Sequence, residues 1–163
     1  MTNTLTGKAH VYNADNIDTD RIIPGKYTKT LDMSELASHV LEDLDPAFSK
    51  TVSVGDVLVA GGNFGCGSSR EQAPIALKAA GVSAVVAKSF ARIFFRNAIN
   101  IGWLVIEAPD HEIQNGATVT IDIENGIIES GGTITRATKM PDVMRAILAE
   151  GGLVNYLNKN GTY

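Results

Sequence analysis

The order of apolar and helical segments between residues 56 and 106 decides which fold class this chain can adopt. Short apolar runs at 56–60, 84–87 and 103–106 have the length and continuity of strands buried on both faces. The segments between them, 71–80 and 90–99, have the composition and spacing of helices. Because strands that alternate with helices pair in parallel, the sequence predicts an α/β fold with a parallel sheet core.

A different pattern follows after residue 109. Residues 118–123 alternate apolar and polar side chains, Asn125-Gly126 is typical of a hairpin turn, and 127–129 forms the returning strand. We therefore expect an antiparallel appendage on the parallel core, within one domain that spans residues 1–163. Four further elements are expected, namely a strand at 8–12, a helix at 32–44, a strand at 133–135 and a helix at 141–149.

Composition and charge exclude several classes of function. The chain has 163 residues, of which 44% are hydrophobic and 20% charged, and its net charge is −4. Lysine and arginine form no basic tail or run, so nucleic-acid binding lacks its usual electrostatic footprint. No apolar run reaches the length of about 18 residues that a membrane span needs, and the first seven residues lack the features of a signal peptide. We expect a cytoplasmic protein that binds neither nucleic acid nor membrane.

Metal-ligating side chains are sparse. Cys66 is the only cysteine, which excludes an intramolecular disulfide and an iron–sulfur cluster ligated by cysteines of this chain alone. Asp15, Asp18 and Asp20 have the density of a calcium loop, but the sixth and twelfth positions, Asp20 and Lys26, are not the required glycine and glutamate. We therefore expect this chain to bind no metal or cofactor itself.

Residues 61–71 are the most informative functional motif. They read Gly-Gly-Asn-Phe-Gly-Cys-Gly-Ser-Ser-Arg-Glu and precede the first predicted helix of the parallel core. Glycines let the backbone approach a ligand closely, and a helix N-terminus directs N–H groups toward an anion. Two hydroxyls and a guanidinium stand beside those N–H groups, so the motif predicts a carboxylate site. It has neither the lysine of a P-loop nor the glycine order of a dinucleotide fingerprint.

Three features of this region also have purely structural interpretations. Ser68 and Glu71 have the spacing of a capping box, in which they would only terminate a helix. Cys66 has no histidine nearby in sequence to act as its base, which favours a packed small residue over a nucleophile. Arg92 and Arg96 share one helical face, which either faces solvent or points at the anion site, and spacing alone does not choose.

Three segments together resemble one protein family. They are Asp-Asn-Ile-Asp-Thr-Asp at 15–20 with Ile-Ile-Pro at 22–24, Gly-Cys-Gly-Ser-Ser-Arg-Glu at 65–71, and Lys-Ser-Phe-Ala-Arg-Ile at 88–93. In this order and spacing the chain is similar to small subunits of 3-isopropylmalate dehydratase, within the aconitase superfamily, over residues 7–157. The resemblance implies the swivelling β/β/α domain that forms the mobile C-terminal domain of aconitase.

The resemblance also implies a partner and a reaction. The partner is a large subunit that carries a [4Fe-4S] cluster, in a heterodimer or heterotetramer. The isolated chain is expected to be inactive and able to form a homo-oligomer. The reaction is a hydro-lyase isomerisation of 2-isopropylmalate and 3-isopropylmalate in leucine biosynthesis. By analogy with the family, Ser68 is the base, Arg70 and Asp20 assist catalysis, and Ser69 and Arg70 bind a substrate carboxylate.

The segment from Tyr27 to Leu31 corresponds to the family's substrate-reading loop. We expect Tyr27, Lys29 and Thr30 to contact the substrate, with Leu31, Ile22 or Ile23 as an apolar neighbour of an alkyl group. The loop matches neither an isopropylmalate nor a homoaconitate pattern cleanly, so homoaconitate and 2,3-dimethylmalate remain alternative substrates.

Two interpretations outside this enzyme class also remain open. A stand-alone dicarboxylate-binding module would use the glycine loop without chemistry. Self-association through the antiparallel appendage and the helix at 32–44 is the third possibility.

Overall fold

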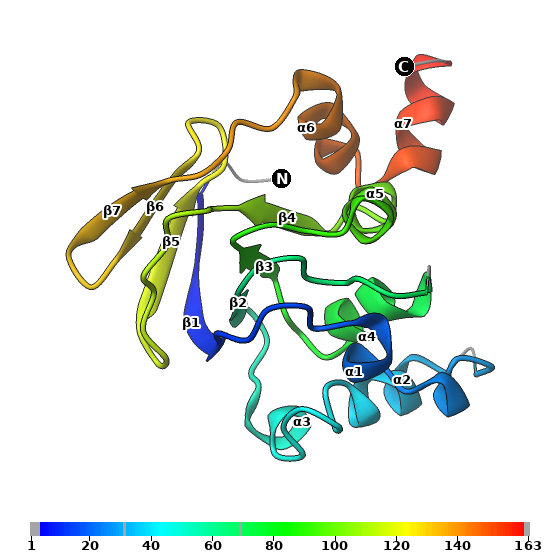
Figure 1. The fold of residues 1–163 in the computed structure, drawn as a ribbon. Coiled ribbons are helices and arrows are strands. Elements are labelled where there is room, and N and C mark those ends of the chain that lie inside the picture. The colour runs from blue at the N-terminus through cyan, green and yellow to red at the C-terminus, as the bar shows by residue number, and fades with distance from the viewer. Residues whose placement is uncertain (1–3, 31, 69, 162–163) are drawn as a thin grey trace.

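A single seven-stranded sheet organises the molecule in the computed structural model, which describes residues 4–30, 32–68 and 70–161. The strand order is β4-β3-β2-β1-β5-β6-β7, and the sheet curls so that β5 to β7 stand to one side of the parallel strands (Figure 1). The strands are β1 (Thr4–Tyr12), β2 (Val57–Ala60), β3 (Ala84–Ala87), β4 (Leu104–Glu107), β5 (Thr118–Asp122), β6 (Ile127–Ser130) and β7 (Thr133–Arg136).

Strand β1 joins the parallel and antiparallel parts of the sheet. Its second half, residues 9–12, pairs in parallel with β2, and its first half, residues 4–8, pairs antiparallel with β5. The strand is therefore four residues longer than the 8–12 expected from sequence, since Thr4 and Thr6 alternate with less exposed neighbours like any half-buried strand. The antiparallel strands β5 to β7 thus continue the core sheet and do not form a separate appendage.

The helices fall into two groups in Figure 1, with α1 to α4 on one side of the view and α5 to α7 on the other. The predicted helices at 71–80, 90–99 and 141–149 are present with slightly different ends, whereas α1, α3 and α7 were not expected. The helices are α1 (Thr19–Ile22), the 3₁₀ helix η1 (Gly25–Tyr27), α2 (Met33–His39), α3 (Phe48–Thr51), α4 (Gln72–Ala79), α5 (Arg92–Asn100), α6 (Asp142–Ala149) and α7 (Leu153–Asn160).

Helix α2 is shorter than the sequence predicts. Its apolar spacing continues to Leu44, but the helix ends at His39, after which Val40 is extended and Leu41 has a φ of +57°. Both Val40 and Leu41 are fully buried, and the Leu41 N–H donates to the Ile22 carbonyl at 2.8 Å. Burial of these two side chains in the core therefore outweighs continuation of the helix, because a buried leucine gains about 1.5–3 kcal/mol.

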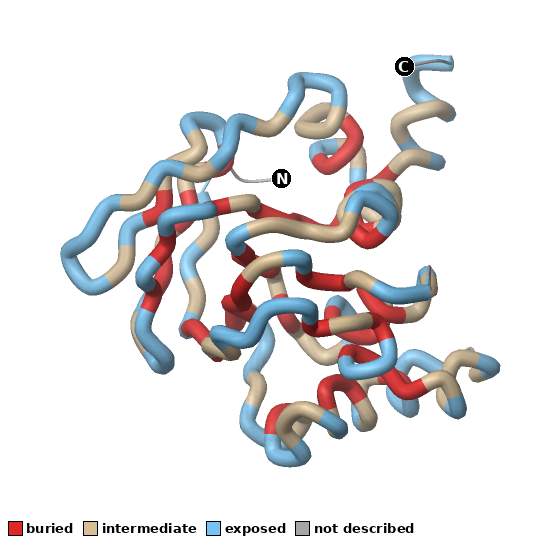
Figure 2. Tube along the Cα trace, viewed as in Figure 1, coloured by how far each residue is buried: buried red, intermediate tan, exposed pale blue. Residues whose placement is uncertain are grey.

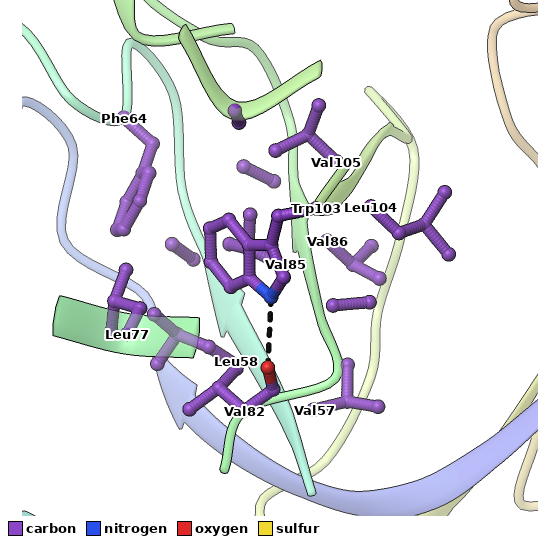
Figure 3. Packing of buried hydrophobic residues seen from close by; sticks show 14 of the residues in the cluster. Val57, Leu58, Phe64, Leu77, Val82, Val85, Val86, Trp103, Leu104 and Val105 are labelled. Carbon is purple, nitrogen blue, oxygen red and sulfur yellow. Dashed lines mark hydrogen bonds between the residues drawn. The ribbon is translucent and has the colours of Figure 1, made fainter. Parts of the chain in front are cut away.

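The core lies between the parallel strands and the helices, where buried segments converge in Figure 2. Every residue of β2 and β3 is buried, as the continuous apolar runs predict. The indole N–H of Trp103 donates to the Val82 carbonyl at 2.8 Å, which satisfies the polar atom of this buried side chain (Figure 3). Among the described residues, no helix is long and apolar enough to cross a membrane.

Candidate functional site

Three loops meet where three adjacent parallel strands end. They follow the carboxyl ends of β1, β2 and β3, the edge at which open α/β sheets bind ligands. The loop after β1 is tied to the loop after β2 by backbone hydrogen bonds from Asn16 N to Gly62 O at 2.9 Å and from Gly65 N to Ile17 O at 2.8 Å. Two of the three sequence segments that resemble the small-subunit family are therefore joined by backbone hydrogen bonds.

The loop after β3 is joined to the glycine loop in the same way. Phe64 N donates to Ser89 O at 3.1 Å, and Ala91 N donates to Phe64 O at 2.9 Å. The Ser89 hydroxyl also accepts the Asn63 N–H at 2.7 Å. The glycine loop is thus held from both sides, which fixes the backbone that carries the candidate catalytic residues.

Two glycines of this loop are required by close contacts. A Cβ at Gly61 would lie 2.5 Å from the Asp15 carboxylate oxygen Oδ1, which itself accepts the Gly62 N–H at 2.7 Å. A Cβ at Gly65 would lie 2.2 Å from Cγ of Phe94, and Gly65 has a φ of +81° that side chains rarely adopt. The glycines therefore let the loop pack directly against the β1 loop and helix α5.

Ser68 lies beside Thr19, the first residue of α1. The Thr19 hydroxyl donates to the Ser68 carbonyl at 2.9 Å, and its oxygen lies 3.5 Å from Ser68 Oγ. Thr19 is only 2% exposed, whereas Ser68 is exposed. The Thr19 N–H donates to the Cys66 carbonyl at 2.9 Å, so both polar groups of Thr19 hold the segment that carries Ser68.

Arg70 forms an ion pair with Asp20 through its Nη1 and the Asp20 Oδ1. The Arg70 side chain is 24% exposed and the Asp20 side chain 63%, so the guanidinium is the more enclosed member of the pair. A Cβ at Gly25 would lie 3.2 Å from Nη2 of Arg70, which means that the guanidinium packs on the backbone of η1. The structure thus brings together Ser68, Arg70 and Asp20, the three residues expected to share catalysis.

A pocket of about 190 Å³ opens at this point. Among the described residues that line it, none carries a carboxylate and the ionisable side chains are arginines, a composition suited to an anion. Its lining residues are Thr19, Gly65, Gly67, Ser68, Arg70, Ala91, Arg92, Ile93, Phe94 and Asn97. A larger groove between α2, α3 and α4 contains neither Ser68 nor Arg70, so its size alone does not make it the candidate site.

The structural interpretation of Ser68 as a helix cap is wrong. Helix α4 begins at Gln72 with Glu71 as its N-cap, and no side chain caps it. Neither Ser68 nor Glu71 therefore forms the capping box that their spacing permits. The N–H groups at the start of α4 are left without a side-chain acceptor from the capping position, which is how helix N-termini that bind anions are arranged.

The two arginines of helix α5, which the sequence could not distinguish, have different surroundings. Arg92, its first residue, lines the pocket. Arg96 is exposed and does not line it. Cys66 is partly buried with a free thiol, and it contributes its carbonyl to the contact with Thr19.

The expected substrate-reading residues Tyr27, Lys29 and Thr30 do not line the pocket. Tyr27 stacks on His39 with ring centroids 3.8 Å apart and an interplanar angle of 4°. The Thr30 hydroxyl accepts the Asp32 N–H at 3.0 Å, and Lys29 is exposed. The loop reaches the site through Gly25, on which the Arg70 guanidinium packs.

A carboxylate anchors the aromatic stack of this loop. His39 Nδ1 lies 2.8 Å from the Glu42 carboxylate, and burial would raise the pKa of Glu42. Hydrogen bonds from His39 and Tyr27 outweigh burial and lower that pKa below its ordinary value. Tyr27 is therefore held against α2 and the turn that follows it.

Some sequence expectations need correction or lie outside the described residues. Ile22 and Ile23 are fully buried core residues, so neither side chain is available to a substrate in this structure. Ser69 and Leu31 are outside the described residues. The sequence reasoning missed Thr19 as a partner of Ser68, although its place between two aspartates of the 15–20 segment marked the neighbourhood.

Metal ligation by this chain has no support in the described ranges. Within residues 4–30, 32–68 and 70–161, no group of three or more histidine, cysteine, aspartate or glutamate side chains could hold a metal ion. The described side chains of the site supply hydroxyl groups, guanidinium groups and the Asp20 carboxylate that is paired with Arg70.

Comparisons with known proteins cover nearly the whole chain. Residues 1–111 match the family model of the aconitase C-terminal domain. The 3-isopropylmalate dehydratase small subunit of Caldicellulosiruptor bescii is 55% identical over 155 residues, which cover 93% of this chain and 93% of the relative. The 2,3-dimethylmalate dehydratase small subunit of Eubacterium barkeri is 51% identical over 159 residues, covering 94% and 98%. A crystal structure of 3-isopropylmalate dehydratase from Methanocaldococcus jannaschii superposes with a TM-score of 0.92 at 51% identity, covering 97% and 95%.

Proposed function

Because the chain belongs to the family of 3-isopropylmalate dehydratase small subunits, which have the aconitase C-terminal fold, we propose that it is one half of a hydro-lyase active site. The reaction we propose is the isomerisation of 2-isopropylmalate and 3-isopropylmalate by dehydration and rehydration, as a step of leucine biosynthesis. The observation that carries the proposal is the pocket in which Ser68, Thr19 and Arg70 meet.

The other half of the site belongs to a large subunit in this proposal. The residues of this chain do not fit an iron–sulfur cluster, since Cys66 is its only cysteine. A [4Fe-4S] cluster on the large subunit would supply a Lewis acid for the departing hydroxyl. The chain is then active only in a heterodimer or heterotetramer.

Ser68 serves as the base in this proposal. In the dehydration step, the C–H bond next to a substrate carboxylate breaks, the proton moves to Ser68 Oγ in its alkoxide form, and the electron pair forms the double bond as hydroxide leaves the neighbouring carbon. In rehydration, hydroxide adds to the carbon that lost the proton, and Ser68 returns the proton to the carbon that lost the hydroxyl. A serine oxygen is a weak base, so its charged form needs stabilisation in a site from which water is excluded.

Thr19 is suited to support both protonation states of Ser68. Its single hydroxyl proton points to the Ser68 carbonyl in the observed hydrogen bond, so its oxygen is then able to accept a hydrogen bond from the Ser68 hydroxyl. When Ser68 Oγ carries the negative charge, rotation of the Thr19 hydroxyl directs that proton to it instead. The N–H groups at the start of α4 add positive potential on the same side.

Arg70 and Ser69 hold one substrate carboxylate in this proposal. A guanidinium binds a carboxylate through two parallel N–H···O bonds, and such charge-assisted bonds are shorter and stronger than neutral ones. The ion pair with Asp20 orients the Arg70 fork, and the Gly25 backbone supports its flat side. Asp20 therefore acts as a positioning residue through Arg70.

The substrate is the finer part of the proposal. The relative from Eubacterium barkeri favours 2,3-dimethylmalate as a second candidate, and homoaconitate is the third. We propose that Tyr27, Lys29 and Thr30 read the part of the substrate that differs among these acids, because their loop begins at the Gly25 contact with Arg70.

An anaerobic hydration assay tests this function. The chain is measured alone and after mixing with a cluster-loaded large subunit, with isopropylmaleate, homoaconitate and dimethylmaleate offered separately, and Lys29→Ala is measured beside the native chain. We expect activity only in the mixture and a change in the ratio of kcat/KM values among substrates for Lys29→Ala. Dicarboxylate binding by the chain alone, without activity in any mixture, would instead establish a binding module.

A further inference from the structure

Arg92 is the positively charged residue of the pocket that has no partner. Arg70 is paired with Asp20, whereas the Arg92 side chain makes no ion pair or hydrogen bond within the described ranges. Arg92 is also exposed, and none of the described residues that line the pocket is an aspartate or glutamate that could compensate its charge. Arg70 in the same pocket is already proposed to bind one substrate carboxylate. The unpaired Arg92 guanidinium is therefore a second group that could bind a carboxylate, because guanidinium groups bind carboxylates strongly.

The fold holds Arg92 at the pocket through its neighbours on both sides. The N–H of the preceding Ala91 donates to the Phe64 carbonyl at 2.9 Å, inside the glycine loop. Two positions later, the ring of Phe94 packs directly on Gly65 and stacks edge-to-face with Phe64, with ring centroids 5.2 Å apart. The backbone on which Arg92 sits is therefore fixed relative to Ser68, although the two residues are 24 positions apart in the sequence.

Two further features make this side of the pocket suitable for a second anionic group. Helix α5 starts at Arg92, and no side chain caps it, so its positive end adds to the charge of the guanidinium. Asn97 lines the same wall and offers an amide N–H₂ donor, and Ile93 adds an apolar surface that is 52% exposed. The part of the pocket formed by α5 thus combines a cation with an apolar contact.

We propose that Arg92 binds the second carboxylate of a dicarboxylate substrate while Arg70 holds the first. This inference rests on the proposed hydro-lyase function and extends it, since it identifies the pocket as a two-carboxylate site built within this one chain. Two cations in one pocket, each holding one carboxylate, would orient the substrate relative to Ser68, which lines the same pocket. Loss of one bidentate contact is expected to raise KM by about tenfold or more.

The test compares Arg92 with Arg96 in the reconstituted complex. Arg96→Gln is the matched control, because Arg96 lies on the same helix, is exposed, and does not line the pocket. Arg92→Gln and Arg92→Lys are assayed for kcat and KM, for the dissociation constant between the subunits, and for inhibition by 2-isopropylsuccinate and by its monoamide at the carboxylate that Arg92 is proposed to bind. This monoamide lacks only the carboxylate charge that would face Arg92.

Arg92→Gln is expected to raise KM and the inhibition constant of the diacid by about tenfold or more, and to leave that of the monoamide within about twofold. Arg92→Lys should recover part of the loss, and Arg96→Gln should match the native chain. Unchanged constants for Arg92→Gln in an active complex would overturn this inference alone. An equal rise in the subunit dissociation constant would also overturn it, since Arg92 would then be a partner contact. A native complex inactive on every substrate would overturn the proposed function and this inference together.

Discussion

The Thr19 hydroxyl donates a hydrogen bond to the Ser68 carbonyl at 2.9 Å, although 49 residues separate the two positions in the chain. The bond joins the segment that follows β1 to the segment that follows β2. The Thr19 N–H donates a second hydrogen bond between the same segments, to the Cys66 carbonyl. The position of Ser68 is thus determined by the segment that also supplies Asp20 to Arg70. One short segment therefore positions both groups that we propose to act on the substrate.

Replacing Thr19 with valine tests this relationship. Valine keeps the shape of threonine but removes the hydroxyl, so the Ser68 carbonyl loses its donor and Ser68 Oγ loses its neighbour. We expect kcat of the reconstituted enzyme to fall by about tenfold, the equivalent of one hydrogen bond, while KM changes by less than about twofold. Thr19→Ser should restore most of kcat. A native kcat for Thr19→Val would show that the hydroxyl has no role in positioning Ser68.

The contact between Gly65 and Phe94 predicts a loss of stability. Gly65→Ala places a methyl group 2.2 Å from Phe94 Cγ at a φ of +81°, so it combines overpacking with backbone strain. The free energy of unfolding should fall by roughly 2–4 kcal/mol, measured by urea denaturation of the full chain. Gly116→Ala is the matched control, because Gly116 has a φ of +83° and no atom within 4 Å of its Cβ position. Equal losses for the two variants would contradict the packing argument.

The buried pair of His10 and Asp56 predicts how stability depends on pH. Their side chains are 2.7 Å apart at His10 Nε2, and Asp56 also accepts the Ser53 N–H at 2.9 Å. Burial alone would raise the pKa of Asp56, but these hydrogen bonds lower it below the ordinary value of 3.8. The unfolded state therefore binds the proton more tightly, and the stability contributed by Asp56 is lost as pH falls from about 4 through its folded pKa.

Urea denaturation between pH 7 and pH 3 measures this dependence. Asp56→Asn should lower the free energy of unfolding at pH 7 by about 1–3 kcal/mol and flatten its decline below about pH 4. Asp110→Asn, which removes an exposed carboxylate, should keep the native slope. The same slope in Asp56→Asn as in the native chain would assign the acid sensitivity to other groups.

The sequence predicted those parts of the fold that depend on local pattern. The continuous apolar runs of β2 and β3 and the Asn125-Gly126 turn each appear where expected. The end of α2 was predicted wrongly, because helical spacing persists through Val40 and Leu41 while their burial in the core needs a different backbone. Helix α7 was not expected, and none of its residues is buried, so its pattern carries little signal.

In the candidate site, too, the sequence predicted some features and not others. The glycine loop was recognisable because several glycines, two serines and an arginine adjoin a helix start, and the family resemblance that it supported is confirmed by relatives about 50% identical. The contact of Thr19 with Ser68 and the different surroundings of Arg92 and Arg96 were not predictable, since both depend on how distant loops pack at one sheet edge. The roles of Ser69, Tyr27, Lys29 and Thr30 stay predictions.

The most direct test of the account is the activity of Ser68→Ala in the complex reconstituted with a cluster-loaded large subunit. If Ser68 moves the substrate proton, kcat should fall by at least about a thousandfold, as the loss of a base or nucleophile does in other enzymes, while the subunits assemble with native affinity. Cys66→Ala is the control in the same loop and should retain activity, because the thiol has no part in the proton transfer. A kcat for Ser68→Ala within about tenfold of the native value would contradict the assignment of Ser68 as the base.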